Sequence, residues 1–189
     1  MKKVLLSALI LGSAFVSNAQ STVFKPFKVD LALGYAMPGG SGAKGGILFA
    51  VEPKYAINDN IALGLRMEGA VMARAAVSPN GQEASGDVKA SGSYLATGDY
   101  YFNTNSFRPF AGVGVGLFKN AAVAFDTGTA EANEVAASSK FGAAPRVGFE
   151  AGHFRMAIEY NVMGKTGSIN NNYLGIKIGA FIGGGRLSK

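Results

Sequence analysis

The sequence contains no cysteine and no tryptophan, and histidine occurs once, at His153. The lack of cysteine excludes disulfide bonds and a lipid anchor attached to cysteine. Charged residues make up only 16% of the 189 residues, against about 25% in an ordinary soluble domain, whereas 48% are hydrophobic. The hydrophobic content excludes a disordered chain, and the shortage of charge is unfavourable for a fully solvated surface.

Residues that commonly perform catalysis are also scarce. His153 lies in a short turn between two predicted strands, where a surface role is expected. The carboxylates of Glu68, Glu150 and Glu159 have the chemistry for acid–base work, but each has basic neighbours that favour structural ion pairing. The sequence offers no nucleophile–base pair and no histidine-rich metal set. We therefore predict no enzyme activity, no catalytic residue, no cofactor and no metal site.

The formal net charge of +6 includes two lysines among the first three residues, and no lysine or arginine cluster occurs in the rest of the chain. A nucleic-acid partner is therefore not expected. The two lysines precede an apolar run from Val4 to Val16, and Ser17-Asn18-Ala19 supplies the small residues of a signal-peptidase site. As a helix, the run would rise only about 20 Å, short of the ~30 Å hydrocarbon core of a membrane. We predict a signal peptide over residues 1–19 and one domain over residues 20–189.

After residue 20, apolar and polar residues alternate in many segments, which is the pattern of β-strands with two different faces. Eight such segments can be identified: Phe27–Ala36, Gly46–Ile57, Ile61–Ala73, Gly92–Phe102, Phe107–Phe118, Phe141–Ala151, Phe154–Met163 and Asn172–Ile182. Their connections are alternately long and short. The long ones are Met37–Gly45, Arg74–Ser91, Lys119–Lys140 and Gly164–Asn171. This alternation is typical of an up-and-down transmembrane barrel, which has short turns at one end and longer loops at the other.

The charged residues of these segments all fall on the polar face. They are seven basic and six acidic residues: Lys28, Asp30, Glu52, Lys54, Arg66, Glu68, Asp99, Arg108, Arg146, Glu150, Arg155, Glu159 and Lys177. The same face is interleaved with glycine and alanine, whereas a solvated sheet surface usually carries Thr, Lys, Glu and Gln. Small residues beside long ionic ones suit a narrow interior in which charges compensate one another. We therefore predict an all-β, eight-stranded antiparallel transmembrane β-barrel, with apolar side chains facing lipid and a structural charge network in the lumen.

The stretch Arg108–Phe118 contains Gly112, Gly114 and Gly116, a spacing that also occurs in nucleotide-binding loops. A phosphate site would need these glycines at a turn between a strand and a helix, and no helix is indicated here. We expect them instead to make space in the lumen for long side chains that cross from opposite strands, or to ease local bending. Pro145 removes a backbone donor from the sixth segment, so a β-bulge is expected near Ala144 and Pro145.

Three stretches, "KKVLLSALILGSAFVSNAQ", "YYFNTNSFRPFAGVGVGLF" and "NNYLGIKIGAFIGGGRLSK", resemble the small outer-membrane β-barrel proteins of Gram-negative bacteria, a porin-like family that includes the OmpA and OmpX type. The resemblance implies location in the outer membrane, contact with its lipid and lipopolysaccharide, and insertion by the barrel-assembly machinery. It makes Phe181 the candidate aromatic residue of the insertion signal. An even number of strands places both termini on the periplasmic side.

The sequence indicates the function of the protein less directly than its fold. An eight-stranded barrel is narrow enough for side chains to fill, so general porin activity is not expected. The leading hypothesis is a structural, adhesion or surface-interaction role through the external loops, with an external partner that the sequence does not identify. The alternatives are a narrow conduit or binding protein for a small, hydrophobic molecule, and a membrane enzyme that uses Glu68 or Glu159.

Overall fold

The computed structural model describes residues 23–39, 43–77, 83–124, 133–166 and 169–187. The predicted signal peptide, residues 1–19, lies outside this part of the chain. The described residues contain no helix that is long and apolar enough to cross a membrane.

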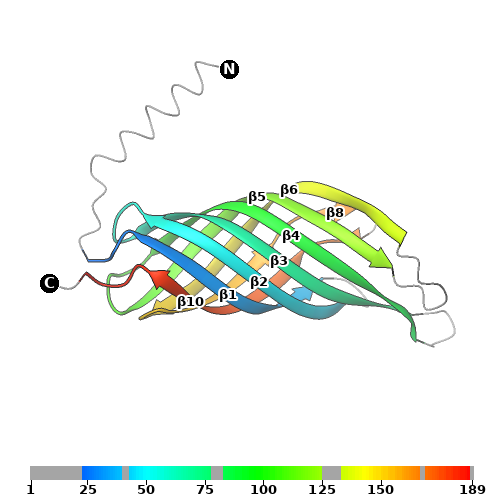
Figure 1. Ribbon diagram of the computed structural model, residues 1–189, viewed down its shortest axis with the longest axis horizontal. Helices are drawn as coiled ribbons and strands as arrows, with labels where there is room; N and C mark the ends of the chain where they lie inside the picture. The colour runs from blue at the N-terminus through cyan, green and yellow to red at the C-terminus, as the bar shows by residue number, and fades with distance from the viewer. Residues whose placement is uncertain (1–22, 40–42, 78–82, 125–132, 167–168, 188–189) are drawn as a thin grey trace, which may run out of the picture.

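Eight antiparallel strands close into one barrel, as predicted (Figure 1). They are β1 (Phe27–Pro38), β2 (Ala43–Ala56), β3 (Ile61–Val77), β4 (Glu83–Tyr101), β5 (Phe107–Ala124), β6 (Asn133–Ala151), β7 (Phe154–Asn161) and β10 (Tyr173–Gly183). Neighbours in the chain are neighbours in the sheet, and β1 pairs with β10 to close the circle. Two short strands, β8 (Lys165–Thr166) and β9 (Ile169–Asn170), pair with each other between β7 and β10.

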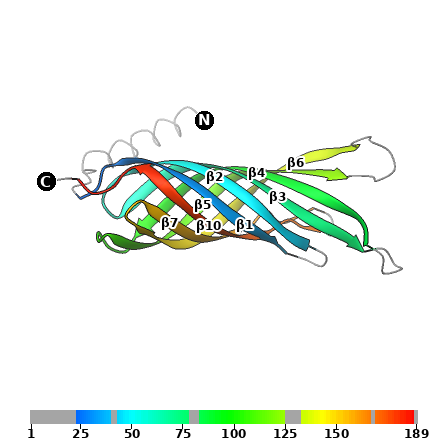
Figure 2. The ribbon, with the colours of Figure 1, turned by 60° about the horizontal axis from the view of Figure 1, so that its bottom comes forward.

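Strands β3 to β6 are longer than the sequence pattern predicts. Residues 83–91 and 133–140 were predicted as parts of loops, but they continue β4 and β6, which pair with extended ends of β3 and β5. These hairpins project beyond the other strands at one end of the barrel (Figures 1 and 2). The sequence signal is weak there because the non-polar positions of these segments hold only Ala, Gly and Val, with no large apolar side chain to mark the outer face.

The two faces of the barrel have the predicted composition. Large apolar side chains such as Leu65, Val113 and Ile178 are about half exposed on the outside, whereas the charged side chains of the strands are buried inside. Exposed aromatic residues gather at both ends of this outer surface. Phe27, Tyr55, Phe102, Phe107 and Phe154 lie at the end with short turns, and Tyr35, Phe49, Tyr94 and Phe141 lie toward the other end. An apolar band between two aromatic belts is the exterior of a membrane-spanning barrel.

The first and last described residues close the end with the short turns. Leu187 N–H donates to the Val23 carbonyl, and Lys25 N–H donates to the Gly185 carbonyl, both at 2.8–2.9 Å. The Asp59 carboxylate, in the β2–β3 turn, accepts hydrogen bonds from the N–H groups of Val23 and Phe24. The Phe24 side chain is thereby held buried across the mouth of the barrel.

The bulge predicted near Ala144 and Pro145 is absent. β5 and β6 keep one register through Pro145, and the pairs Arg146–Glu159 and Ala143–Val162 belong to one register between β6 and β7. Ala143 and Val162 exchange two backbone hydrogen bonds, so position 145 is the next at which β6 should donate to β7. Proline cannot donate, and the ladder is interrupted there without an inserted residue. The bulge between β5 and β6 lies farther along, at Asn120 and Ala122.

Candidate functional site in the barrel interior

The structure places every charged residue predicted for the lumen inside the barrel. All thirteen side chains belong to residues that are at most 7% exposed. They come from all eight barrel strands, so the charge is distributed around the whole wall. Such burial of ions is tolerable only where each one is paired.

Glu150 is the centre of pairing near the short-turn end. Its carboxylate accepts hydrogen bonds from Lys28, from Arg155 Nη1 at 2.5 Å and from Arg108 Nη2 at 2.6 Å. The Tyr101 hydroxyl adds a fourth donor at 2.7 Å. Three cations and a phenol thus converge on one carboxylate.

Asp99 has the same role at mid-height. Lys54 Nζ, Arg146 Nε and Arg155 Nη2 lie 2.7, 2.8 and 2.9 Å from its oxygens. Asp30 is held less closely: Lys54 Nζ lies at 2.8 Å, Arg155 Nε at 3.4 Å and Lys28 Nζ at 3.6 Å. Arg155 contacts Glu150, Asp99 and Asp30. The charges around Glu150 and those around Asp99 therefore form one connected network, the lower network.

A second network lies toward the projecting hairpins. Lys177 Nζ donates to Glu68 at 2.8 Å and to Glu159 at 2.9 Å, and Arg66 pairs with Glu159 from the opposite wall. The Tyr173 hydroxyl donates to the other oxygen of Glu68 at 2.6 Å. Arg146 lies 3.8 Å from Glu159 and links this network to the lower one.

Apolar side chains fill the interior beyond the ions. From the sequence we predicted a charge network in the lumen and did not predict these apolar side chains. Among the described residues, the larger of two buried clusters consists of Ala36, Leu48, Ala70, Met72, Leu95, Phe118, Ala144, Met163 and Tyr173, and the smaller of Ala62, Tyr101, Phe110 and Ala157. The strand alternation does put residues such as Leu48 and Leu95 on the inner face, so the signal was present in the sequence. The lumen is therefore layered, with ions in the middle and apolar plugs toward the hairpin end.

The opposite mouth is closed by rings over cations. The Arg108 guanidinium lies 3.8 Å from the centre of the Phe24 ring and 4.2 Å from that of Tyr101. Phe181, the candidate insertion-signal residue, is buried inside the barrel, with Lys28 Nζ 4.3 Å from its ring centre. His153 is exposed, as expected, and its Nδ1 lies 2.9 Å from the Phe181 carbonyl oxygen. The rings of Phe24, Tyr101 and Phe181 and the cations of Lys28 and Arg108 thus pack together at this end of the barrel.

Gly112 makes space for one of the ions. A Cβ at this position would lie 2.1 Å from Asp99 Oδ1, and one at Gly114 would lie 3.0 Å from Leu95 Cδ1. Both neighbours belong to the adjacent strand β4, rather than to strands across the lumen. The glycine-rich stretch is thus a strand that gives room to the side chains beside it.

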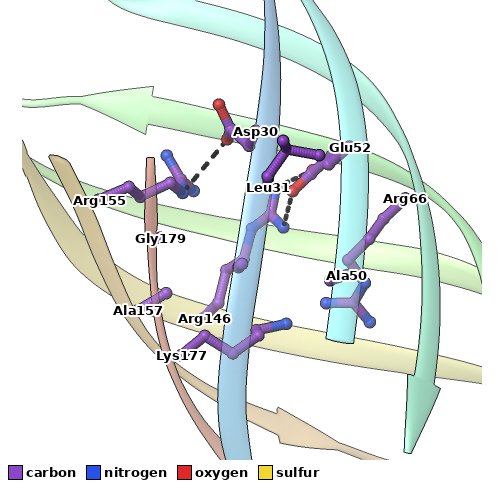
Figure 3. A pocket seen from close by; sticks show the side chains of 11 residues that line it. Asp30, Leu31, Ala50, Glu52, Arg66, Arg146, Arg155, Ala157, Lys177 and Gly179 are labelled. Carbon is purple, nitrogen blue, oxygen red and sulfur yellow. Dashed lines mark hydrogen bonds and ion pairs between the residues drawn. The ribbon is translucent and has the colours of Figure 1, made fainter. Parts of the chain in front are cut away.

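The carboxylates that could act as acids or bases are held in ion pairs. Each of the carboxylates considered for acid–base work, Glu68, Glu150 and Glu159, is buried and contacts at least two basic side chains. Among the described residues, no group of three or more His, Asp or Glu side chains is placed to hold a metal ion. Between the networks lies a cavity of about 20 Å³ (Figure 3), and a second of the same volume lies beneath Phe24 at the short-turn end. The arrangement can hold the walls together and exclude water from the lumen.

The closed eight-stranded antiparallel barrel is the fold of the small outer-membrane proteins. Among solved structures, the chain is similar to Neisserial surface protein A, with 19% identity, a TM-score of 0.57, and 85% of this chain and 98% of that chain covered. It is similar to the outer membrane protein OprG from Pseudomonas aeruginosa, with 14% identity, a TM-score of 0.50, and coverage of 90% and 100%. No protein-family model and no curated protein matches the sequence.

Proposed function

We propose that the protein is an integral outer-membrane barrel that acts as a sealed scaffold for a surface-interaction site at the projecting ends of β3–β6. The supporting observation is the reversal of polarity across the wall: Leu65 is 65% exposed on the outside, while its neighbour Arg66 is 1% exposed inside. A soluble barrel would bury the apolar face and solvate the charged one. Only a lipid surrounding makes this arrangement favourable.

The proposed orientation puts both termini in the periplasm and the projecting hairpins outside the cell. Loops and strand ends held on a rigid scaffold are the usual place for recognition. Two of the hairpins extend beyond the rest of the wall, where they would stand above the lipid and lipopolysaccharide (Figure 2). Such strand ends are accessible to an external partner, which the described residues do not identify.

Location and orientation can be tested together, because the chain has no cysteine of its own. Ser139 is exposed near the hairpin end, and Asn105 is exposed in the β4–β5 turn at the other end. On intact cells, a membrane-impermeant thiol reagent should label Ser139→Cys and leave Asn105→Cys unlabelled. The reverse result would invert the proposed orientation, and recovery of the protein outside the outer-membrane fraction would contradict the proposed location.

The surface role is tested by shortening the β3–β4 and β5–β6 hairpins at their projecting ends. Cells that carry the shortened protein should lose adhesion to other cells or to matrix, while the folded barrel keeps its heat-dependent mobility on a gel. Unchanged adhesion by folded, shortened protein would refute this role.

The two alternatives give different outcomes. A conduit or binding protein for a small hydrophobic molecule requires single-channel conductance in a planar bilayer or a melting temperature that rises with the ligand. We expect neither, because ion pairs and apolar clusters fill the interior. An enzyme requires an activity that Glu68→Gln or Glu159→Gln removes from folded protein, and we assign no such activity.

A further inference from the structure

One small cavity of the described interior lies between the two charge networks. It has a volume of about 20 Å³, enough for one water molecule or one small ion. The cavity exists because small residues, including Ala50 and Ala157, occupy the inner face where the lower and upper networks meet. Larger side chains at these positions would fill it.

Most of the ionised side chains that line this cavity are cationic, and each of these cations also contacts carboxylates of the two networks. Four cationic side chains line it, from Arg66, Arg146, Arg155 and Lys177, against two carboxylates, from Asp30 and Glu52. Among the residues whose burial the structure describes, the strands bury seven basic and six acidic side chains, a surplus of one positive charge. An uncompensated charge inside a sealed, low-dielectric barrel is costly, so a compensating anion would be bound favourably.

Two of the lining cations have hydrogen-bonding capacity to spare. The Lys177 ammonium has three N–H groups, and its hydrogen-bond acceptors are Glu68 and Glu159. Arg66 Nε is buried and has no hydrogen-bond acceptor among the described residues. Figure 3 shows Arg66, Arg146 and Lys177 reaching into the interior from three different strands. Asp30 is the opposing feature, because both of its oxygens lack a hydrogen-bond donor; Lys54 at 2.8 Å and Arg155 at 3.4 Å offset its charge.

We propose that this cavity binds one monovalent anion of the size of chloride, held mainly by Lys177 and Arg66. The anion offsets this surplus of buried positive charge. It is a structural ligand of the barrel, and the site is separate from the proposed surface-interaction site.

A chloride titration of the purified barrel in detergent tests this proposal. At constant ionic strength, replacement of gluconate by chloride should raise the unfolding temperature along a saturating curve, because a ligand of the folded state stabilises it by mass action. Gluconate is too large for the cavity and screens the ion pairs equally. A temperature that does not change, or that changes linearly without saturation, would overturn the proposal.

Cavity-filling variants localise the effect without removing a charge. Ala157→Val and Ala50→Val should abolish the saturating chloride response, whereas Ala96→Val, at an exposed alanine on the outer surface, should keep it. Full chloride dependence in either folded cavity variant would refute the site. If neither variant folds, crystals of the unaltered protein grown in bromide decide the question. Anomalous signal within contact of Lys177 Nζ and Arg66 would support the anion, and its absence there, with water in the cavity, would overturn it.

Discussion

Arg146 and Glu52 form a two-point ion pair across the full width of the barrel. Arg146 Nη2 donates to Glu52 Oε1 at 2.7 Å, and Nη1 donates to Oε2 at 3.0 Å. The two residues lie on β6 and β2, which are four strands apart in either direction around the closed sheet. A planar, bidentate contact of this kind fixes both distance and orientation, so it ties opposite walls together.

Breaking this pair should be costly. Arg146→Met leaves Glu52 and Asp99 short of a buried partner, and Glu52→Gln leaves Arg146 undercompensated; we expect each to destabilise the barrel by about 3–5 kcal/mol. The double variant should cost less than the sum of the two, because it leaves no orphaned charge of the pair. Urea unfolding in lipid vesicles measures all three free energies. Lys25→Met, at an exposed position, serves as the control. Additive losses would show that the two residues act independently.

Gly112 and Gly69 provide a matched pair of substitutions. Gly112→Ala places a methyl group against the Asp99 carboxylate, and we expect a loss of about 1–3 kcal/mol from overpacking. Gly69→Ala meets no atom within 4 Å, so it should be neutral or slightly stabilising. The two unfolding midpoints in urea make the comparison. Equal effects would mean that the cost of alanine comes from the strand backbone and not from Asp99.

The interrupted ladder at Pro145 should be repairable. Pro145→Ala restores an N–H group opposite the backbone of Tyr160, and one added hydrogen bond is worth about 1 kcal/mol. Backbone amides of β6 and β7 around this position should then exchange more slowly with deuterium. Pro53→Ala is the control: it lies on β2, which pairs with neither β6 nor β7, so it should leave exchange around position 145 unchanged. If exchange around position 145 is unchanged, the missing donor is not what opens the ladder.

The sequence was sufficient for the fold because lipid and lumen impose opposite polarity on alternate residues. This alternation located all eight strands and put residues such as Leu65 and Arg66 on the correct faces. It did not identify residues 83–91 or 133–140 as strand, because their non-polar positions hold only Ala, Gly and Val and no large apolar side chain marks the lipid face. Nor did it reveal the ion pairs. Contact between Arg146 and Glu52 depends on how far the strands are staggered when the sheet closes, and that stagger has no local signature in the sequence.

Lipid accessibility of individual side chains provides the final test. Single cysteines at Leu65, Val113 and Arg66 can be spin-labelled in protein reconstituted into bilayers, because the unaltered chain has no cysteine. Labels at Leu65 and Val113 should relax strongly with a lipid-soluble quencher, while a label at Arg66 should be shielded from it. Shielded labels at positions 65 and 113, together with an exposed one at position 66, would mean that the apolar face is the inside of the barrel and that the protein does not span a membrane.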